Sequence, residues 1–398
     1  MPLILHLVLN DYVHDNRVRR AAETGALLGN RVVLFALHRT PLPRREDHGA
    51  LRVLRFALTT RSWSKIKPVQ LLKYLEAALR MIRRGIVLRP DLVHAHDADT
   101  LPIGWMIARC TGARLVYDAH ELWCDPHRIS YLPPWISRMV VQIERRLAGR
   151  SATVITVSDH IARYMRLRLR ILSPLVVRNM PERWGKPTPL RLRTALSIPS
   201  TSLIFLYQGV IAGEGVHLLL DAFLRLGGNC HLVYLGNGSD VTALQCRAES
   251  APLMRQRIHF HEAVSAEDLP FFTADADVGV LSIAGHSLSY SWSLPNKLFE
   301  SIQGGLAIIA SRRPEMADVL RNHQCGLTFS TWDCAALTRC MQTLVNDPVQ
   351  LDSLRKASNR AARTLCWENE RMALCEIYKR LIRMDNPQHP TKRSSRQP

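Results

Sequence analysis

The sequence contains no unbroken run of about 18 apolar residues, which is the length that a membrane-spanning helix needs. Its first residues, MPLILHLVLNDYVHD, have no basic lead, and polar residues follow where a signal peptide would be cleaved. We therefore expect Leu3–Val8 to form a buried strand and the protein to be cytoplasmic.

Paired cysteines are also missing. The nine cysteines are scattered, with no CxxC pair and no knuckle with histidine. This spacing argues against a structural zinc module and indicates isolated buried thiols.

Acidic residues are few beside basic ones, and the balance is uneven along the chain. The net charge is +19, and residues 1–182 contain 29 Lys and Arg against 15 Asp and Glu, whereas the remainder has 24 against 19. A basic first half indicates an anionic partner such as a membrane surface, a pyrophosphate-linked acceptor or nucleic acid; Arg-rich solvated helices are the alternative. The arginines between Arg163 and Arg170 alternate with aliphatic rather than stacking aromatic residues, which argues against nucleic acid and favours peripheral contact with the inner face of an anionic membrane. Val69–Arg84 is a second candidate for that contact.

What the sequence does contain is a repeated alternation of short apolar runs and helical stretches, typical of a doubly wound parallel sheet. At 398 residues with 47% hydrophobic content, the chain suits two such α/β domains. The strands expected in the first half are Leu3–Val8, Arg31–Ala36, Leu51–Phe56, Leu92–His94, Arg114–Tyr117, Thr153–Val157 and Leu175–Val177. Those expected in the second half are Leu203–Tyr207, His231–Leu235, Ile258–Phe260, Val278–Leu281, Ala307–Ala310 and Leu327–Phe329.

The two halves meet at a proline-rich stretch, which predicts a linker. We expect two Rossmann-like domains that face a cleft, followed by a helix that packs back on the first domain and a disordered tail. The predicted parts are residues 1–182, the linker 183–200, the second domain 201–365, the helix 366–384 and the tail 385–398.

The segment Ser293–Ser311, SLPNKLFESIQGGLAIIAS, carries the strongest chemical signal. Pro295 precedes a helix whose first turn, at Asn296 and Lys297, offers free N–H groups, a positive dipole end and a cation to an anion. Glu300 lies one turn further on, where a carboxylate can accept hydrogen bonds from a ribose diol. An ordinary capped helix with a surface Glu is the alternative.

This segment resembles the donor-site signature of the family 4 glycosyltransferases, which have the GT-B fold and usually retain anomeric configuration. Segments Ile258–Val278 and Leu235–Gly238 are similar to that family's base-recognition strand and glycine turn. The resemblance implies a nucleotide-sugar donor bound by Lys297, Glu300 and Asn296, by Gly209 and Gly236, and by the backbone at Val264.

Segments of the first half resemble the same family in the expected order: Asp15–Ala21, Leu28–Leu34, Pro90–Pro102, Leu115–Glu121, Thr153–Ala162 and Val177–Pro181. The resemblance implies His120 near the reacting sugar and Asp97 on the acceptor side as the catalytic pair. It further implies an acceptor side that includes Arg17, His94, His96 and Glu121. A saccharide or lipid-linked acceptor, with no cofactor and no metal ion, is expected, although His94-x-His96-Asp97 leaves a metal site as an alternative.

Three features depart from the family pattern. Val210 and Glu214 stand where basic residues are usual, Trp292 replaces a glutamate, and the first loop lacks its glycine pair. A degenerate relative that binds nucleotide, sugar or a partner protein without turnover is therefore a second hypothesis, and a GT-B nucleotide-sugar epimerase is a third.

Overall fold

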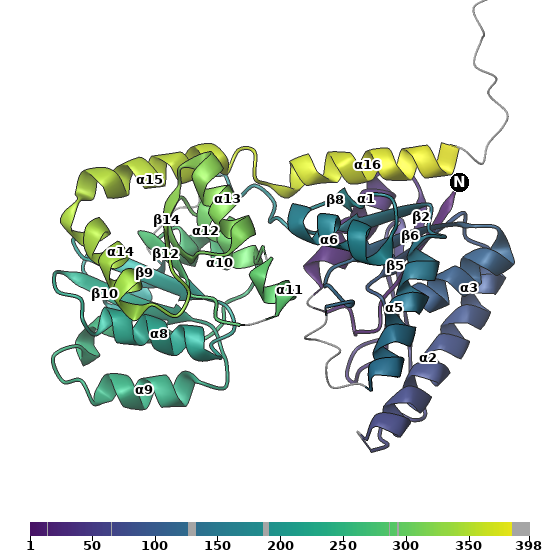
Figure 1. Ribbon diagram of the computed structural model, residues 1–398, viewed down its shortest axis with the longest axis horizontal. Helices are drawn as coiled ribbons and strands as arrows, with labels where there is room; N and C mark the ends of the chain where they lie inside the picture. The colour runs from purple at the N-terminus through teal and green to yellow at the C-terminus, as the bar shows by residue number, and fades with distance from the viewer. Residues whose placement is uncertain are drawn as a thin grey trace, which may run out of the picture. The chain divides into compact units, whose positions relative to one another are not determined.

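The computed structural model describes residues 1–13, 15–64, 66–125, 133–185, 191–285, 287–292 and 294–383. Of Arg383, only the backbone is described. By its internal contacts the chain divides into two units. Unit 1 comprises Met1–Val177 and the chain from Arg371 onward, and unit 2 comprises Arg178–Glu370. Each unit is a twisted sheet covered by helices on both sides (Figure 1).

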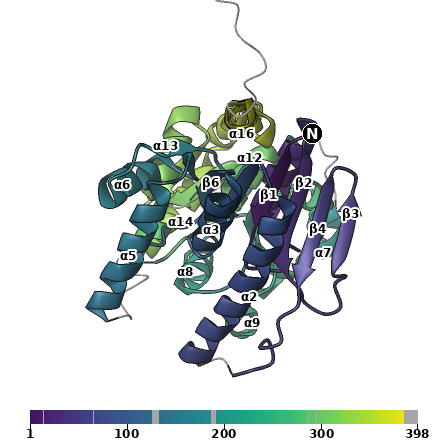
Figure 2. The ribbon, with the colours of Figure 1, turned by 90° about the vertical axis from the view of Figure 1, so that its right-hand side faces the viewer.

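Unit 1 contains an eight-stranded sheet in the order β3-β4-β2-β1-β5-β6-β7-β8. All neighbouring strands are parallel except β3, which pairs antiparallel with β4 at the edge of the sheet (Figure 2). The strands are β1 (Leu3–Leu7), β2 (Arg31–Leu37), β3 (Arg45–His48), β4 (Leu51–Phe56), β5 (Leu92–His96), β6 (Arg114–Ala119), β7 (Thr153–Thr156) and β8 (Leu175–Val176).

Helices lie on both sides of this sheet: α1 and α16 on one side, and α2, α3 and α5 on the other (Figure 1). The central strands β1 and β5 are buried along their whole length, as the apolar runs predict. Asp15 and Ser158 cap α1 and α6 by accepting hydrogen bonds from backbone N–H groups of their first turns. The helices are α1 (Asn16–Leu27), α2 (Lys67–Leu88), α3 (Leu101–Thr111), α5 (Pro134–Ala148), α6 (Asp159–Leu169) and α16 (Trp367–Arg383).

Unit 2 contains a six-stranded parallel sheet in the order β11-β10-β9-β12-β13-β14. Separate apolar cores fill its two sides, one under α8, α9 and α14 and the other under α12, α13 and α15. The strands are β9 (Leu203–Gln208), β10 (Cys230–Leu235), β11 (Ile258–His261), β12 (Val278–Leu281), β13 (Ala307–Ser311) and β14 (Gly326–Phe329). The helices are α7 (Arg191–Leu196), α8 (Glu214–Phe223), α9 (Val241–Glu249), α10 (Leu269–Thr273), α11 (Leu288–Ser291), α12 (Asn296–Gln303), α13 (Pro314–His323), α14 (Cys334–Asn346) and α15 (Pro348–Ala361), with a 3₁₀ turn at Arg255–Arg257.

Each sheet reverses its winding at one point, β1/β5 in unit 1 and β9/β12 in unit 2. Ligands of open α/β sheets bind outside the carboxyl ends of the strands at such a point. The residues that follow β5, β6 and β9 are therefore the ones to inspect for function.

Two features differ from the expected organisation. The sequence analysis missed β3, because the charged run Arg45–His48 has no apolar face. The expected linker contains a short helix, α7. The last helix begins in unit 2 and belongs to unit 1 from Arg371 onward. The expected tail, 385–398, lies outside the described residues.

Among the described residues, no helix is both long enough and apolar enough to span a bilayer.

Candidate active site

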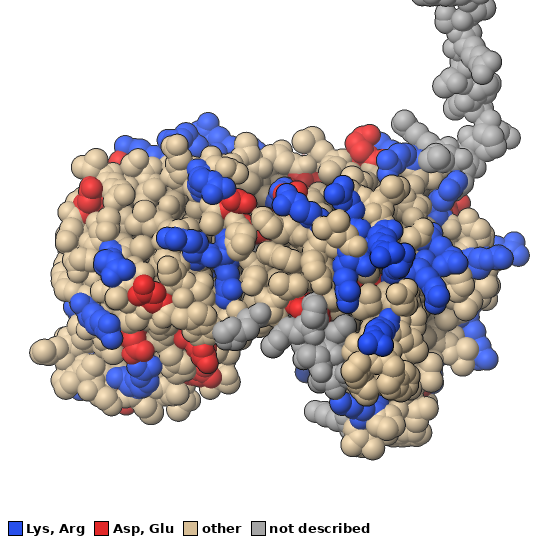
Figure 3. All heavy atoms as spheres, in the orientation of Figure 1, with Lys and Arg blue, Asp and Glu red and all other residues tan. Residues whose placement is uncertain are grey.

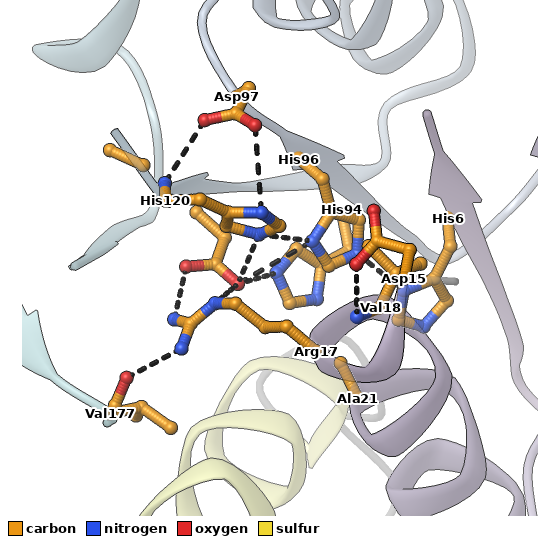
Figure 4. A network of polar contacts seen from close by, with 12 residues as sticks. His6, Asp15, Arg17, Val18, Ala21, His94, His96, Asp97, His120 and Val177 are labelled. Carbon is orange, nitrogen blue, oxygen red and sulfur yellow. Dashed lines mark hydrogen bonds and ion pairs between the residues drawn. The ribbon is translucent and has the colours of Figure 1, made fainter. Parts of the chain in front are cut away.

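In unit 1 the carboxyl ends of β5 and β6 bring five polar side chains together (Figure 4). Asp118, at the end of β6, lies close to all four of the others. Its Oδ2 atom lies 3.0 Å from Arg17 Nε, 3.3 Å from His120 Nε2, 3.4 Å from His96 Nδ1 and 3.6 Å from His94 Nε2.

Arg17 and Asp118 form a buried two-pronged ion pair. Arg17 also donates to Asp118 Oδ1 at 2.5 Å and to the Val177 carbonyl at 2.7 Å. Burial alone would raise the pKa of Asp118, but the guanidinium and the neighbouring His120 hold that pKa well below its ordinary value. The carboxylate is therefore charged at neutral pH, and its ion pair with Arg17 connects α1 to β6.

His120 lies between two carboxylates. Its Nε2 faces Asp118, and its Nδ1 lies 3.5 Å from Asp97 Oδ2. Burial lowers the pKa of His120, but Asp97 and Asp118 outweigh it, so the pKa is raised. Asp97 has a φ of 66°, and this turn lets its Oδ1 accept from the backbone N–H groups of His120 and Glu121.

Two side-chain groups have the composition of a metal site: His6, His94 and His96, and His96, Asp118 and His120. An imidazole nitrogen binds metal in the plane of its ring. The rings of His94 and His96 are stacked, 4.2 Å apart and 18° from parallel, so an ion in the plane of one lies far outside the plane of the other. In the second group, Asp118 Oδ2 already accepts from the Arg17 guanidinium, a poor neighbour for a divalent cation.

The side chains expected to face an acceptor thus divide into two sets. Arg17, His94 and His96 are buried, so they contact other side chains of unit 1 and do not reach solvent. Asp97 and His120 keep 28% and 15% of their side-chain surface exposed, and Glu121 is exposed. His94 also bonds the Tyr378 hydroxyl of α16, at 2.7 Å.

In unit 2 the loops after β9 and β10 pack backbone against backbone. A Cβ on Gly236 would lie 2.0 Å from the Gly209 carbonyl oxygen, and one on Gly238 would lie 2.0 Å from that of Ile211. Gly209 and Gly236 also have φ values of 110° and 147°. These two glycines therefore shape the loops at the switch point, which is a local reason for their presence.

Lys297, in the first turn of α12, reaches back to the end of β9. Its Nζ donates to the Tyr207 hydroxyl at 2.9 Å and lies 4.1 Å from the centre of the Tyr207 ring. Burial lowers the pKa of Lys297 to about 8, against an opposing effect of Glu300. The ammonium is therefore held at the end of β9 in an environment that would favour an added negative charge.

Glu300 is held by the residue next to Tyr207. Gln208 donates from Nε2 to Glu300 Oε2 at 2.8 Å and accepts from the Thr273 hydroxyl at 2.9 Å. Asn296 begins α12 after Pro295, and no side chain among the described residues caps that helix start. Val264 lines a hollow with Ser265, Asp268 and Phe272.

Sequence reasoning missed His6, Tyr378, Tyr207 and Gln208. His6 and Tyr207 lie within apolar strand runs that indicate only burial, and Tyr378 lies on a helix far along the chain. Gln208 carried a usable signal, because it is a polar residue at a strand end directly before a glycine.

The comparisons with known proteins agree across both units. A family model for a glycosyl transferase 4-like domain matches residues 15–179, and a model for glycosyl transferases group 1 matches residues 202–347. None of the curated proteins matches.

Solved structures show the same architecture. Sucrose-phosphate synthase from Thermosynechococcus elongatus is similar with a TM-score of 0.79 and 18% identity, over 97% of this chain and 100% of that one. HepE of Anabaena, solved with UDP-glucose, has a TM-score of 0.73 and 14% identity, over 96% and 100%. WaaG, a glycosyltransferase involved in lipopolysaccharide biosynthesis, has a TM-score of 0.66 and 14% identity, over 94% and 99%. The two parallel-sheet units are those of the GT-B fold, which confirms the expected fold class.

Proposed function

The chain belongs to the group 1 glycosyltransferases of the GT-B fold and is a transferase, and on this premise we propose that it moves a sugar from a nucleoside-diphosphate sugar to a saccharide or lipid-linked acceptor. We further propose that the transfer retains anomeric configuration and needs neither a metal ion nor another cofactor.

The observation that carries the proposal is the pairing of α12 with the end of β9. Lys297 and Glu300 lie one helical turn apart, and Tyr207 and Gln208 hold them at 2.9 and 2.8 Å. A cation beside an uncapped helix start suits a diphosphate, and a carboxylate one turn away suits a ribose diol. A nucleoside diphosphate carries both a diphosphate and a ribose diol, so one ligand can contact Lys297 and Glu300 together.

In the proposed reaction the bond between the anomeric carbon and the diphosphate oxygen breaks, and the acceptor oxygen bonds to that carbon on the same face. The acceptor proton goes to the departing phosphate oxygen, so no protein base is required. Lys297 and the first turn of α12 stabilise the leaving charge. His120 and Asp97 hold the reacting sugar and the acceptor.

A panel of UDP, GDP and TDP sugars tests the proposal, with released nucleoside diphosphate as the readout and saccharide acceptors added in turn. UDP sugars come first, because HepE was solved with UDP-glucose. Glu300→Ala should remove the release, whereas Glu249→Ala, an exposed glutamate at the end of α9, should leave it unchanged. Nucleotide binding without release from any donor would overturn the transfer.

That outcome would favour a second candidate, a protein that binds nucleotide or sugar without turnover. A specific observation supports it. The start of α8 carries the exposed Glu214, and the neighbouring Gly213 N–H already donates to Asp240 at 2.9 Å. This helix start is therefore poorly suited to a diphosphate, which leaves the helix start of α12 and Lys297 to hold it.

We also propose that unit 1 contacts the inner face of an anionic membrane, where a lipid-linked acceptor would lie. Two helices that both contact α3 carry exposed apolar stripes at four-residue spacing. On α2 the stripe is Leu71, Leu75 and Leu79, 50–58% exposed, and on α5 it is Trp135, Met139 and Ile143, 41–66% exposed.

Basic side chains accompany these stripes. Lys and Arg are numerous over unit 1 on the face seen in Figure 3, with few Asp and Glu among them. On α6 and at its C-cap the four arginines of the predicted basic surface are all exposed: Arg163, Arg166, Arg168 and Arg170. Apolar stripes with a basic surround suit an interfacial surface.

Vesicle co-sedimentation tests this contact. Binding should require anionic lipid, fall with salt, and weaken in Leu75→Glu, while Leu253→Glu, at a leucine of unit 2 that is even more exposed (93% against 51%), should not weaken it. Equal binding to neutral vesicles would count against the proposal.

A further inference from the structure

A chain of three imidazoles runs from the centre of the sheet in unit 1 to its carboxyl edge. His6 Nδ1 lies 3.0 Å from His96 Nε2, and His96 Nδ1 lies 3.1 Å from His120 Nε2. His120 Nδ1 then faces Asp97 (Figure 4). Each ring of the chain thus uses both nitrogens except His6, whose buried Nε2 has no hydrogen-bond partner among the described residues.

The inner two rings are neutral and the outer one favours a charge. His6 and His96 are buried, and burial lowers their pKa values well below the ordinary value. His120 differs, because Asp97 and Asp118 raise its pKa against the effect of burial. Arg17 also faces this group, and its positive charge lowers the pKa of His120. His94 lies beside it, and burial lowers the pKa of His94 as well.

The hydrogen-bond pattern gives the chain a direction. With N–H groups on both nitrogens, His120 donates toward Asp97 on one side and toward Asp118 and His96 on the other. His96 Nδ1 must then accept, so its single proton is on Nε2 and is donated to His6 Nδ1. A neutral imidazole has one donor and one acceptor, so the order is fixed along the whole chain.

We propose that His96 and His6 are positioning residues that hold His120 as a double N–H donor in front of Asp97. They fix the orientation of its ring and keep Nε2 from becoming a bare acceptor that faces the Asp118 carboxylate. The inference rests on the proposed role of His120 in transfer, but the state of the ring can be measured without turnover.

The competing arrangement is the reversed chain. There a neutral His120 would accept at Nε2 from His96, and His96 would accept from His6. In that order Asp97 and Asp118 would both face a neutral imidazole, without the positive charge that the two carboxylates favour on His120. A zinc ion bound by these histidines is a second competitor.

The test uses the full chain with ¹⁵N-labelled histidine, and single variants to assign the signals. Scalar coupling between His96 Nε2 and His6 Nδ1, with the proton on His96 Nε2, is the expected result in the unaltered protein. Protons on Nδ1 of His96 and His6 would show the reversed chain and overturn the proposal. Zinc bound in a one-to-one ratio, with loss of these N–H signals, would overturn it as well.

Two substitutions of His96 test the effect on His120. His96→Leu removes the acceptor, so the pKa of His120 should fall and the alkaline limb of kcat/KM should move to lower pH. His96→Gln can accept through Oε1 and donate through Nε2, so it should restore both. Tyr378→Phe is the matched control, because it removes a buried hydroxyl of the same cluster that bonds His94 and lies outside the chain.

An unchanged His120 titration in His96→Leu would overturn the positioning role, whether or not the protein transfers sugar. Should that variant fail to fold, the nitrogen coupling in the unaltered protein still decides the direction of the chain. An absence of transfer together with the expected coupling would refute the proposed function and leave this inference intact.

Discussion

The proposed role of Lys297 gives nucleotide binding an expected pH dependence that can be calculated. The pKa of this ammonium is lowered to about 8, because burial disfavours its charge. A bound diphosphate would restore the charged form, so binding takes up a proton above pH 8. With a pKa of about 8, the charged fraction falls from about nine-tenths at pH 7 to about one-tenth at pH 9.

The affinity for a nucleoside diphosphate should therefore fall about tenfold between pH 7 and pH 9, which is about 1.4 kcal/mol. Tyr207 adds no change in this range, because burial raises its pKa to about 12 and keeps its hydroxyl protonated. Calorimetric titration with UDP at pH 7, 8 and 9 measures the slope directly. Titration in buffers of different ionisation enthalpy measures the proton taken up.

Lys297→Arg is the matched control, since a guanidinium stays charged throughout this range. The affinity of Lys297→Arg for UDP should change little between pH 7 and pH 9. Ionisation of the nucleotide affects both proteins equally, so it cancels when the two slopes are compared. The same slope in both proteins, or no slope in the unaltered one, would refute the reasoning.

Three further substitutions test the site and its support. Glu300→Ala should weaken nucleotide binding by about 1.5–3 kcal/mol, roughly 10- to 100-fold, while loss of the Gln208 hydrogen bond should lower the melting temperature by only a few degrees, and calorimetry checks both. Gly236→Ala forces a Cβ to 2.0 Å from a carbonyl oxygen and should lower the free energy of unfolding by about 2–4 kcal/mol, whereas Gly227→Ala, with open space around it, should change it by less than about 0.5 kcal/mol. Arg17→Met leaves Asp118 charged and buried, so urea unfolding at pH 7 should show a loss of about 3–5 kcal/mol. Because the pKa of Asp118 is lowered in the fold, the loss should shrink as the pH falls below the ordinary carboxyl value, and an equal loss at pH 3 would contradict the ion-pair account.

The sheet architecture could be predicted from the sequence, because parallel strands that are buried on both faces consist of short continuous runs of apolar residues. Leu92–His94 and Leu203–Tyr207 lie within observed strands for this reason. The strand at Arg45–His48 could not be found, because an antiparallel edge strand needs no apolar face.

The spacing of the candidate site residues was predictable where they lie on one element of the sequence. Lys297 and Glu300 share one helix, so their spacing is visible in the chain. The division of the histidines was not visible, because His94 and His96 lie on one strand, His120 follows the next, and only the tertiary fold decides which of them is buried. The role of Gln208 was not predicted, because its hydrogen-bond partner Glu300 lies 92 residues away in the sequence.

The last helix has a consequence for how the protein is made. Tyr378 covers the histidine cluster of unit 1, because its hydroxyl bonds His94 and its ring packs edge-on against the His94 ring. It is translated more than 200 residues after Val177, where the first part of that unit ends. A nascent chain must therefore carry His94 uncovered while the whole of unit 2 is synthesised. Release from the ribosome before Arg371 would leave the first unit with its interior open to water, whatever the state of the second.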